Sequence, residues 1–248
     1  MIVSIANQKG GVGKTTTAVN LAACLAEAGE QALLVDLDPQ ANATSGLGEA
    51  PNGSSSYDLL DGASVAEVAR PTRFDNLELV PAKAELAGAA VELGKHADGE
   101  RYLQTSLAGA RERYRFVFLD CPPSFGPLTV NALAAADRVI VPVQAEYYAL
   151  EGLSQLLGSI ELVKKRLNPR LGIAGILLTM VDVRTRLAAD VEAEVRRHFG
   201  DLVFTTTVPR SVRLAEAPSH GLPAIAYDRR SAGAEAYWKV AMELVQRS

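Results

Sequence analysis

The sequence lacks the long uninterrupted apolar run that a membrane-spanning helix requires. Although 48% of its 248 residues are hydrophobic, no stretch approaches the roughly 18 consecutive apolar residues of a span. Met1 leads directly into a short apolar run and a glycine-rich segment, without the pattern of a cleavable signal. We therefore expect a cytoplasmic protein that makes no membrane contact.

Cysteine is also scarce. The only two, Cys24 and Cys121, lie far apart and belong to no CxxC or Cys/His cluster, which excludes a disulfide framework and a zinc-type metal site. We expect both to be buried, reduced thiols. Glycine, proline and charged residues occur in ordinary amounts, which excludes fibrous and disordered classes.

The net charge of −4 is unevenly distributed. Residues 1–160 hold 11 Lys and Arg against 19 Asp and Glu, a balance of −8, whereas residues 161–248 hold 14 against 10, a balance of +4. Basic charge concentrated in the last third permits a local surface for an anionic partner on an acidic protein. Scattered, solvated charges are the alternative.

Short apolar runs alternate with longer stretches of helical pattern. The runs are continuously hydrophobic, which indicates strands of a parallel sheet covered on both faces. Stretches such as 15–28 and 150–167 are long enough for crossover helices, residues 232–246 have the spacing of a helix docked on the core, and residues 46–56 indicate a mobile surface loop. The sequence predicts one P-loop α/β domain over residues 1–248, a doubly wound, mostly parallel sheet with helices on both faces. The predicted strands are MIVSIA, QALLVDLD, LELVPA, FVFLDCP, RVIVPVQ, GIAGILLTMV and LVFTTTVP.

A glycine-rich segment between the first predicted strand and the first predicted helix points to phosphate binding. Its glycines let backbone N–H groups converge on phosphate oxygens, and the start of the following helix adds partial positive charge. Lys14 can reach the β- and γ-phosphates, and the Thr15 hydroxyl can bind Mg²⁺. Gln8 stands where the standard phosphate loop has its first glycine, so this is a KGGxGKT variant, in which Lys9 alone could be a solvated charge. The segment reads Lys9, Gly10, Gly11, Val12, Gly13, Lys14, Thr15, Thr16.

Two carboxylates follow the second predicted strand. Asp36 and Asp38 stand at its carboxyl end, the edge at which α/β sheets bind ligands. Phosphoryl transfer needs a group that orients the attacking nucleophile and a carboxylate near the metal ion. Either aspartate could orient an attacking water, and either could instead stabilise the turn that follows.

A third carboxylate, Asp120, ends the apolar run 116–119. Four apolar residues followed by aspartate is the form of a Walker B strand, whose carboxylate holds the metal ion directly or through water. Because this pattern follows a phosphate loop in the same chain, the two together predict an ATPase that uses ATP and Mg²⁺.

A series of motifs resembles the ParA/Soj partition ATPases of the deviant Walker A group, within the MinD/ParA superfamily. The likeness covers nearly the whole chain. The first and third motifs are shared with MinD and the nitrogenase iron protein, whereas PVQAEYYALEGL and RLAEAPS are typical of the Soj-type branch. The chain shows no MinD-type membrane tail, no cluster-ligand companion for Cys121 and no helix-turn-helix extension before the phosphate loop. The motifs, in order, are KGGVGKTT, DLDPQANATSGLG, DCPPS, PVQAEYYALEGLSQL, LLTMVD and VPRSVRLAEAPSHG.

The resemblance implies roles for individual residues. In this family ATP joins two subunits face to face, and Lys9 matches the signature lysine that contacts the partner's nucleotide. Lys14 and Thr15 match the phosphate-binding lysine and the metal-binding threonine. Asp38 matches the aspartate that activates hydrolysis, and Asp120 matches the Walker B aspartate.

The resemblance also implies contacts with adenine and DNA. Pro209, Arg210 and Ser211 match the turn that contacts the adenine side, although many relatives have asparagine at the third position. Arg184 and Arg213 match arginines that bind DNA without sequence preference. A surface salt bridge is the alternative for each arginine.

The predicted function is therefore an ATP-dependent switch. ATP and Mg²⁺ order residues 36–48, a homodimer forms and binds non-specific DNA on the nucleoid, and hydrolysis drives chromosome or plasmid partition. Hydrolysis is weak alone and is stimulated by a ParB/Spo0J-type partner with a basic N-terminal segment. The alternative is a ParA-like ATPase that positions a protein cargo or regulates septum placement or replication. A metabolic kinase or ligase would need an acceptor motif, which we do not find.

Overall fold

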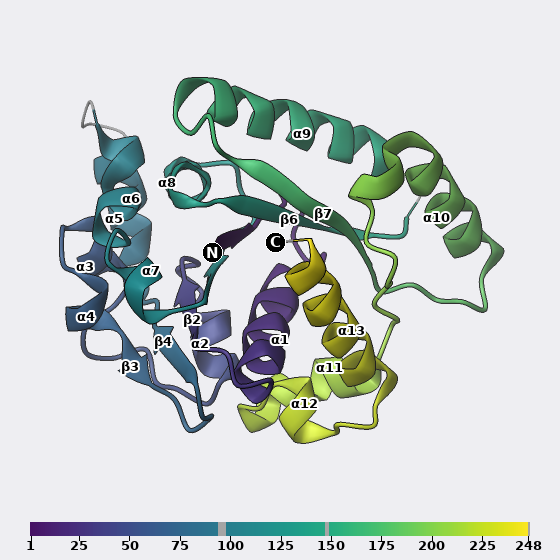
Figure 1. Cartoon of the computed structure of the whole chain (residues 1–248), viewed down its shortest axis with the longest axis horizontal. Helices are drawn as coiled ribbons and strands as arrows, with labels where there is room; N and C mark the ends of the chain where they lie inside the picture. Colours follow the sequence, from purple (N-terminus) through teal and green to yellow (C-terminus); the bar gives the residue numbers. More distant parts are fainter. Residues whose placement is uncertain (94–97, 147–148, 248) are drawn as a thin grey trace.

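A seven-stranded sheet forms the centre of the computed structural model, which describes residues 1–93, 98–146 and 149–247 (Figure 1). The strand order is β3-β4-β2-β5-β1-β6-β7, and only the β3–β4 pair is antiparallel. The predicted doubly wound, mostly parallel sheet is confirmed. The strands are β1 (Ile2–Ile5), β2 (Ala32–Asp36), β3 (Arg70–Pro71), β4 (Leu77–Val80), β5 (Phe116–Asp120), β6 (Arg138–Gln144) and β7 (Gly172–Thr179).

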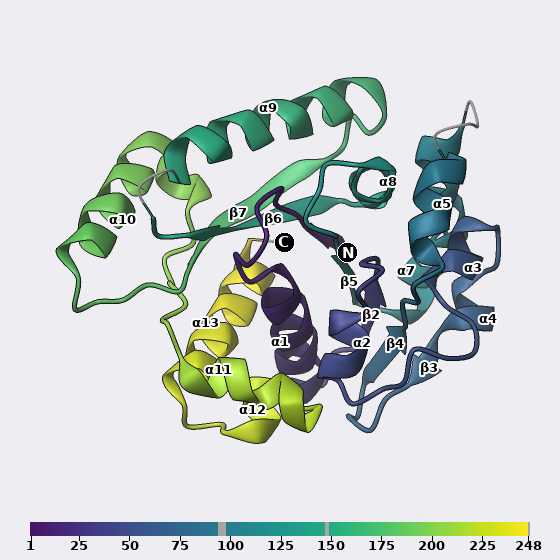
Figure 2. The same cartoon turned by 180° about the vertical axis from the view of Figure 1, so that it is seen from behind.

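Helices cover both faces of the sheet, as its continuously apolar strands require (Figures 1 and 2). On one face, α1 (Lys14–Glu27) packs beside α13 (Ala232–Gln246), and a buried hydrogen bond of 3.0 Å joins the Thr17 and Tyr237 hydroxyls. The other face carries α8 (Pro127–Ala135) and α9 (Ala149–Arg166). The three helices predicted at 15–28, 150–167 and 232–246 are confirmed to within a residue.

Apart from α10, the remaining helices have eight residues or fewer. None of the helices in the described parts of the chain is long and apolar enough to cross a membrane. Both cysteines are buried and free, as expected. The remaining helices are α2 (Asn42–Gly46), α3 (Ser56–Leu60), α4 (Val65–Val68), α5 (Leu86–Leu93), α6 (Tyr102–Ser106), α7 (Ala110–Arg113), α10 (Arg186–Phe199), α11 (Val212–Glu216) and α12 (Ala224–Tyr227), with 3-10 turns at Gly99–Arg101, Gly200–Leu202 and Ala217–His220.

The run LVFTTTVP, residues 202–209, does not form the predicted strand, so this prediction is wrong. The segment pairs with its neighbours only through isolated bridges, Val203 with Ile176 and Pro209 with Val181. Conversely, the two-residue strand β3 was not predicted. It lies at the edge of the sheet and ends at a proline, which an edge strand tolerates.

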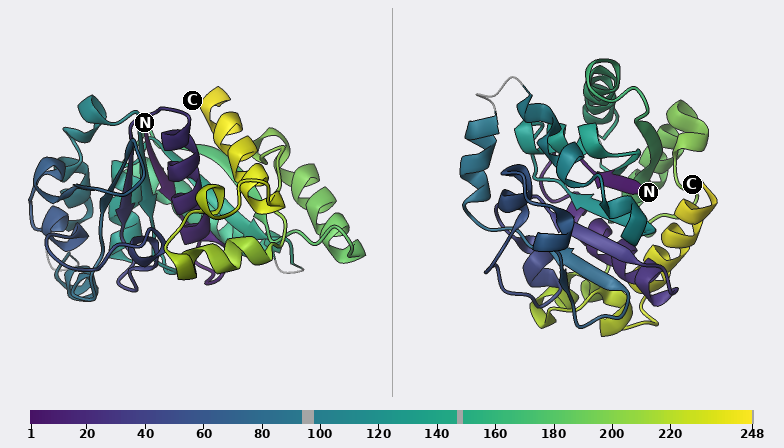
Figure 3. Two further views of the ribbon diagram at one scale, coloured as in Figure 1. Left: turned by 90° about the horizontal axis from the view of Figure 1, so that it is seen from below. Right: turned by 60° about the vertical axis from the view of Figure 1, so that its left-hand side comes forward.

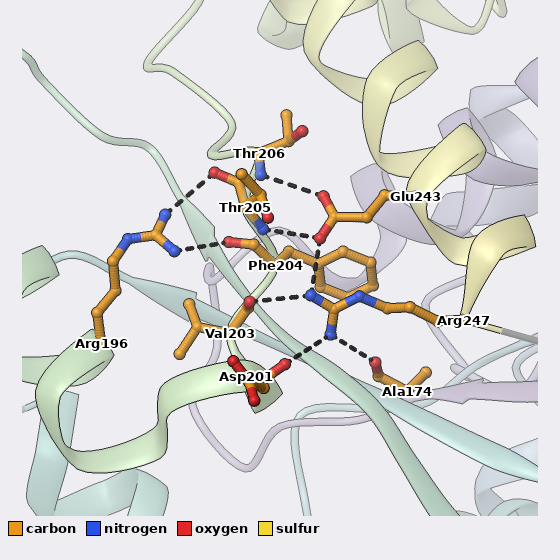
Figure 4. Close-up of polar contacts among 9 residues, drawn as sticks. All are labelled: Ala174, Arg196, Asp201, Val203, Phe204, Thr205, Thr206, Glu243 and Arg247. Atoms are coloured by element: carbon orange, nitrogen blue, oxygen red, sulfur yellow. Dashed lines mark hydrogen bonds and ion pairs between the residues drawn. The ribbon is translucent and has the colours of Figure 1, made fainter.

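Side chains of α10 and α13 take the backbone hydrogen bonds that a strand would use in this run (Figure 4). The Glu243 carboxylate accepts the N–H groups of Thr205 and Thr206 at 2.8 and 3.2 Å. Arg196 and Arg247 donate to backbone carbonyls of the same segment. Because these groups satisfy the backbone, the β-propensity of its valine and threonine residues does not produce a ladder.

Candidate functional site

The phosphate loop joins β1 to α1, as predicted, and α1 begins at Lys14. Gly11 and Gly13 have φ angles of 72° and 86°, in the left-handed region that glycine adopts without strain. Gly13 is the N-cap of α1 and supplies no side-chain hydrogen bond to it. The first N–H groups of α1 therefore have no intrahelical acceptor and can bind an anion.

A threonine from the neighbouring part of the sheet supports this loop. Thr179, the last residue of β7, is buried and donates from its hydroxyl to the Val12 carbonyl at 2.9 Å. This contact fixes the position of the loop. Sequence reasoning did not assign Thr179, and its only signal is a polar residue that ends an apolar strand at the ligand-binding edge.

The two lysines of the loop occupy different places. Lys14 is buried, and its Nζ donates to the Lys9 carbonyl at 3.0 Å. Burial lowers the pKa of Lys14, while the carboxylates of Asp120 and Asp38 raise it. The Lys9 side chain is 56% exposed, and its Nζ lies 2.6 Å from the Glu146 carboxylate. The curved phosphate loop, residues 9–16, is called the cradle below. Lys14 lies inside this cradle, and Lys9 lies exposed on its rim.

The Asp36 carboxylate is held by hydrogen bonds from the segment that follows it. Its fully buried carboxylate accepts hydrogen bonds from the Thr44 N–H at 2.8 Å, the Thr44 hydroxyl at 2.7 Å and the Asp38 N–H at 3.1 Å. Burial raises the pKa of Asp36 to about 6, against the opposing effect of these bonds. Because the carboxylate is occupied by bonds to the 38–44 segment, Asp36 is suited to holding that segment rather than to orienting water.

Asp38 is placed differently. One carboxylate oxygen accepts the Gln40 N–H at 3.0 Å, and none of the described residues donates to the other. The side chain is 7% exposed and lies close enough to Lys14 to affect its pKa. Of the two alternatives, the geometry favours Asp38 as the group that could orient a water molecule.

Asp120 has the features of a metal-binding carboxylate. It pairs with Asp36 in the register between β5 and β2 and is fully buried. Neither of its oxygens accepts a hydrogen bond of normal geometry from the described residues. Burial and the charge of Asp36 raise the pKa of Asp120 well above its usual value and outweigh the nearby Thr15 hydroxyl, which lowers it.

These orphaned oxygens fit a bound cation, because a buried polar atom without a partner is costly. Within the described ranges no cluster of three or more histidine, cysteine, aspartate or glutamate side chains could hold a metal by itself. Thr15 and Asp120 would therefore need water and phosphate oxygens to complete a Mg²⁺ shell, as is usual for nucleotide-bound magnesium.

A pocket of about 310 Å³ adjoins the phosphate loop. Its walls combine Gly13 and Thr16 with the Pro209, Arg210 and Ser211 turn and the aromatic ring of Tyr237. The sequence placed that turn on the adenine side, and the structure brings it beside the loop. Its contact with a base stays a prediction.

Arg184 lies in the loop before α10, and Arg213 lies in the first turn of α11. Arg184 follows Val181 by three residues and Arg213 follows Pro209 by four, and Val181 and Pro209 are bridged. Each arginine is paired with acidic neighbours. Arg184 binds Asp182 at 2.7 Å, while Arg213 binds Glu216 at 2.9 Å and Asp228 at 3.4 Å. The salt bridges weighed as an alternative are present, and DNA contact stays a prediction.

The motif PVQAEYYALEGL contributes Glu146, the partner of Lys9, which sequence reasoning did not assign. Residues 147–148 of this motif lie outside the described residues. The pairing joins positions 137 residues apart, so no local signal could have revealed it.

A family model and several relatives of similar length match this chain. The model of a family described as an AAA domain matches residues 1–173. The sporulation initiation inhibitor protein Soj of Bacillus subtilis is 54% identical over 246 residues, covering 98% of this chain and 97% of Soj. The chromosome partitioning protein ParA of Caulobacter vibrioides is 49% identical over 251 residues, covering 99% of this chain and 94% of ParA.

Solved structures share the fold. Cobyrinic acid a,c-diamide synthase from Mycobacterium smegmatis, with bound ADP and magnesium, superposes with a TM-score of 0.85 at 37% identity, covering 99% of this chain and 94% of the synthase. The septum site-determining protein MinD of Pyrococcus horikoshii, complexed with Mg-ADP, superposes with a TM-score of 0.75 at 26% identity. The match covers 98% of this chain and 94% of MinD.

Proposed function

The chain belongs to the ParA/Soj family of chromosome-partitioning ATPases, and from that premise we propose that it is an ATP-dependent dimerising switch. ATP binding closes two subunits face to face, the dimer binds DNA without sequence preference on the nucleoid, and hydrolysis releases both contacts. A ParB/Spo0J-type partner with a basic N-terminal segment stimulates hydrolysis.

The positions of the two loop lysines carry this proposal. Lys14 already points into the cradle of its own subunit, so the phosphates of one nucleotide do not require Lys9. Lys9 lies exposed on the rim, where it can exchange its exposed pairing with Glu146 for a nucleotide held by a second copy. A second lysine of this kind suits a site completed by dimerisation.

ATP and Mg²⁺ are the ligands that the site fits. The loop N–H groups and Lys14 bind the phosphates, Thr15 and Asp120 hold the ion, and the 209–211 turn borders the base. When bound, magnesium would neutralise phosphate charge that develops during transfer. The Gln40 N–H holds the Asp38 carboxylate in place, and this carboxylate orients the attacking water.

DNA binding is proposed to depend on pairing two weak surfaces. Arg184 and Arg213 exchange their acidic partners for backbone phosphates. One such patch binds poorly, but two patches in one rigid dimer make the second contact effectively intramolecular, which raises avidity by roughly 10² to 10⁴. Dimerisation therefore controls DNA binding.

The direct test measures retention on duplex DNA of arbitrary sequence with ATP, ADP or no nucleotide, together with mass by light scattering. We expect a dimer retained on DNA only with ATP. A dimer indifferent to DNA would instead support an ATPase that positions a protein cargo or regulates septum placement or replication. The relative named as a synthase adds a further candidate, for which ATP turnover would depend on added cobyrinic acid rather than on DNA.

Replacing Arg184 and Arg213 by alanine should weaken DNA retention and leave the ATP-dependent mass unchanged. Each phosphate left without its arginine should reduce the slope of log affinity against log salt by about 0.9. The matched control is Arg197→Ala, which also removes an exposed arginine from an ion pair, with Glu194. Equal retention of the double variant and the control would remove both arginines from the DNA-binding surface.

Glu146→Gln should favour dimerisation with ATP. The substitution frees Lys9 from its resting partner in both subunits. Because each exposed ion pair is worth about 0–1 kcal/mol, the dimerisation constant should rise by up to roughly 30-fold. Light scattering across a protein concentration series measures it. Glu161→Gln, which breaks the exposed pair with Lys165, is the control. A weaker dimer in Glu146→Gln would show that Glu146 supports the closed state instead.

A further inference from the structure

The edge of the sheet opposite the candidate site carries a row of basic groups. Strands β5, β1, β6 and β7 are neighbours in that order, and each starts at or close to a cation. Arg115 precedes β5, the Met1 ammonium precedes β1, Arg138 begins β6, and Arg170 lies just before β7. Because adjacent strands lie about 4.8 Å apart, the row extends over about 14 Å. The left view of Figure 3 shows the N-terminus at this edge.

Most of these cations have no acidic partner among the residues that the structure describes. None of Arg115, Arg138 and Arg170 takes part in an ion pair with a described residue, nor do Lys164 and Arg166 in the last turn of α9. These five residues are called the basic edge below.

Two carboxylates near these residues, Asp137 and Glu78, are already occupied. Asp137 is held by Arg111 at 2.6 and 2.8 Å and by the Ile2 N–H at 2.8 Å. Glu78 is bound by Arg113 and by the Tyr114 hydroxyl. Asp137 and Glu78 therefore do not neutralise the basic edge, and no described carboxylate forms an ion pair with its five residues.

Local structure does not account for this excess. Cations in the last turn of a helix stabilise its dipole, which explains Lys164 and Arg166 but not residues that precede strands. The Arg115 guanidinium lies 5.8 Å from the centre of the Phe116 ring, and the Arg138 side chain packs on Gly172. The guanidinium itself makes each contact, and that of Arg138 also donates to the Asp137 carbonyl at 3.1 Å. A ring, a glycine and a backbone carbonyl leave both charges without a neutralising partner. Like charges gathered in this way repel one another until an anion binds.

We propose that the basic edge is a second surface for the phosphate backbone of duplex DNA, separate from Arg184 and Arg213. Each DNA strand presents one phosphate per about 3.4 Å along the axis, so the row can face about four of them. The cations are mostly arginines, whose guanidinium binds phosphate through two parallel hydrogen bonds. Their rigid spacing along strand starts suits a rigid, periodic polyanion better than a fluid lipid surface.

The basic edge also differs from the surface formed by Arg184 and Arg213 in how its cations are paired before DNA binds. Arg184 and Arg213 must leave acidic partners to reach phosphate, whereas the basic edge needs no such exchange. It should therefore contact DNA without nucleotide, but more weakly than the affinity that retains the ATP-bound dimer on DNA. If two subunits close at their nucleotide-binding edges, the two basic edges lie at the far ends of the dimer and can hold separate DNA segments. That last consequence rests on the proposed function, and the surface itself does not.

The test compares two charge-matched variants of the full chain. Arg115→Gln with Arg170→Gln removes exposed, unpaired cations from the basic edge. Arg101→Gln with Lys239→Gln removes exposed cations that have no ion pair with a described residue elsewhere on the surface. Affinity for a duplex of arbitrary sequence is measured across a salt series, without nucleotide and with ATP, alongside mass by light scattering.

We expect the basic-edge variant to bind DNA several-fold more weakly than the control under both conditions. Its slope of log affinity against log salt should fall by about 1.8, that is, about 0.9 for each of the two phosphates that the arginines no longer neutralise. Identical slopes in the two variants would overturn the proposal. So would selective weakening of binding to phosphatidylglycerol vesicles with DNA binding intact, which would identify a membrane surface. Binding without nucleotide reports on the basic edge, whereas the increase with ATP and the dimer mass report on the proposed function, so the two can fail separately.

Discussion

Replacing Asp38 by alanine is expected to lower ATP hydrolysis by roughly 10²- to 10⁴-fold, the range over which a positioned acid–base group contributes. The carboxylate has one oxygen fixed by the Gln40 N–H and one free of described donors, so the substitution removes the group that orients water without removing a phosphate or metal ligand. ATP binding and dimerisation should persist. The variant should remain a DNA-retained dimer long after the wild type has dissociated.

Phosphate release and light-scattering mass, measured on the same sample with ATP, decide this prediction. The control is Asp58→Ala, an aspartate whose carboxylate is bound within the capping box of α3. A monomeric Asp38 variant with ATP would contradict the assigned role, because it would show that Asp38 builds the dimer. Unchanged hydrolysis would move the role to another group.

Replacing Asp36 by alanine, unlike replacing Asp38, is expected to cause a large decrease in the stability of the fold. The substitution leaves the Thr44 N–H and the Asp38 N–H without their acceptor in a buried site. Each unsatisfied donor costs about 1–3 kcal/mol, so the free energy of unfolding should fall by about 3 kcal/mol. For a chain of this size that corresponds to a fall in Tm of roughly 6–12 °C.

Thermal unfolding without nucleotide measures the effect, and Asp38→Ala is the matched control two residues away. The loss of unfolding free energy caused by Asp36→Ala should grow as the pH is lowered. Because burial raises the pKa of Asp36 to about 6, above its usual 3.8, the stabilising contribution of this group is full below about pH 4 and is lost as the pH rises through 6. Equal Tm values for the two variants would show that the Thr44 bonds contribute nothing to the fold.

The sequence predicts those parts of the candidate site that are contiguous in the chain. The phosphate loop and Asp120 are predicted because a strand, its apolar neighbours and the residue that follows form one short pattern. The contacts that position them were missed. Thr179 reaches Val12 across 167 residues, and Glu146 reaches Lys9 across 137. Pairings of this kind depend on which strands become neighbours, and no local pattern encodes that.

The wrong strand at 202–209 has the same physical origin. Its valines and threonines favour a strand, but the donors and acceptors that compete for its backbone come from Arg196, Glu243 and Arg247. Local propensity determines the conformation of a segment when the groups that bond to its backbone are close in the sequence. For residues 202–209 two of these groups come from the C-terminal end of the chain, so local propensity fails.

The same polar network ties the last turn of α13 to the wall of the nucleotide pocket. Glu243 and Arg247 hold residues 203–206, and the chain reaches the 209–211 turn within a few residues. A fusion partner or fluorophore attached beside Arg247 would pull on that wall and alter nucleotide affinity by mechanical means. The exposed loop at 51–54 lies outside this network, and it is the better place for a reporter in every experiment described above.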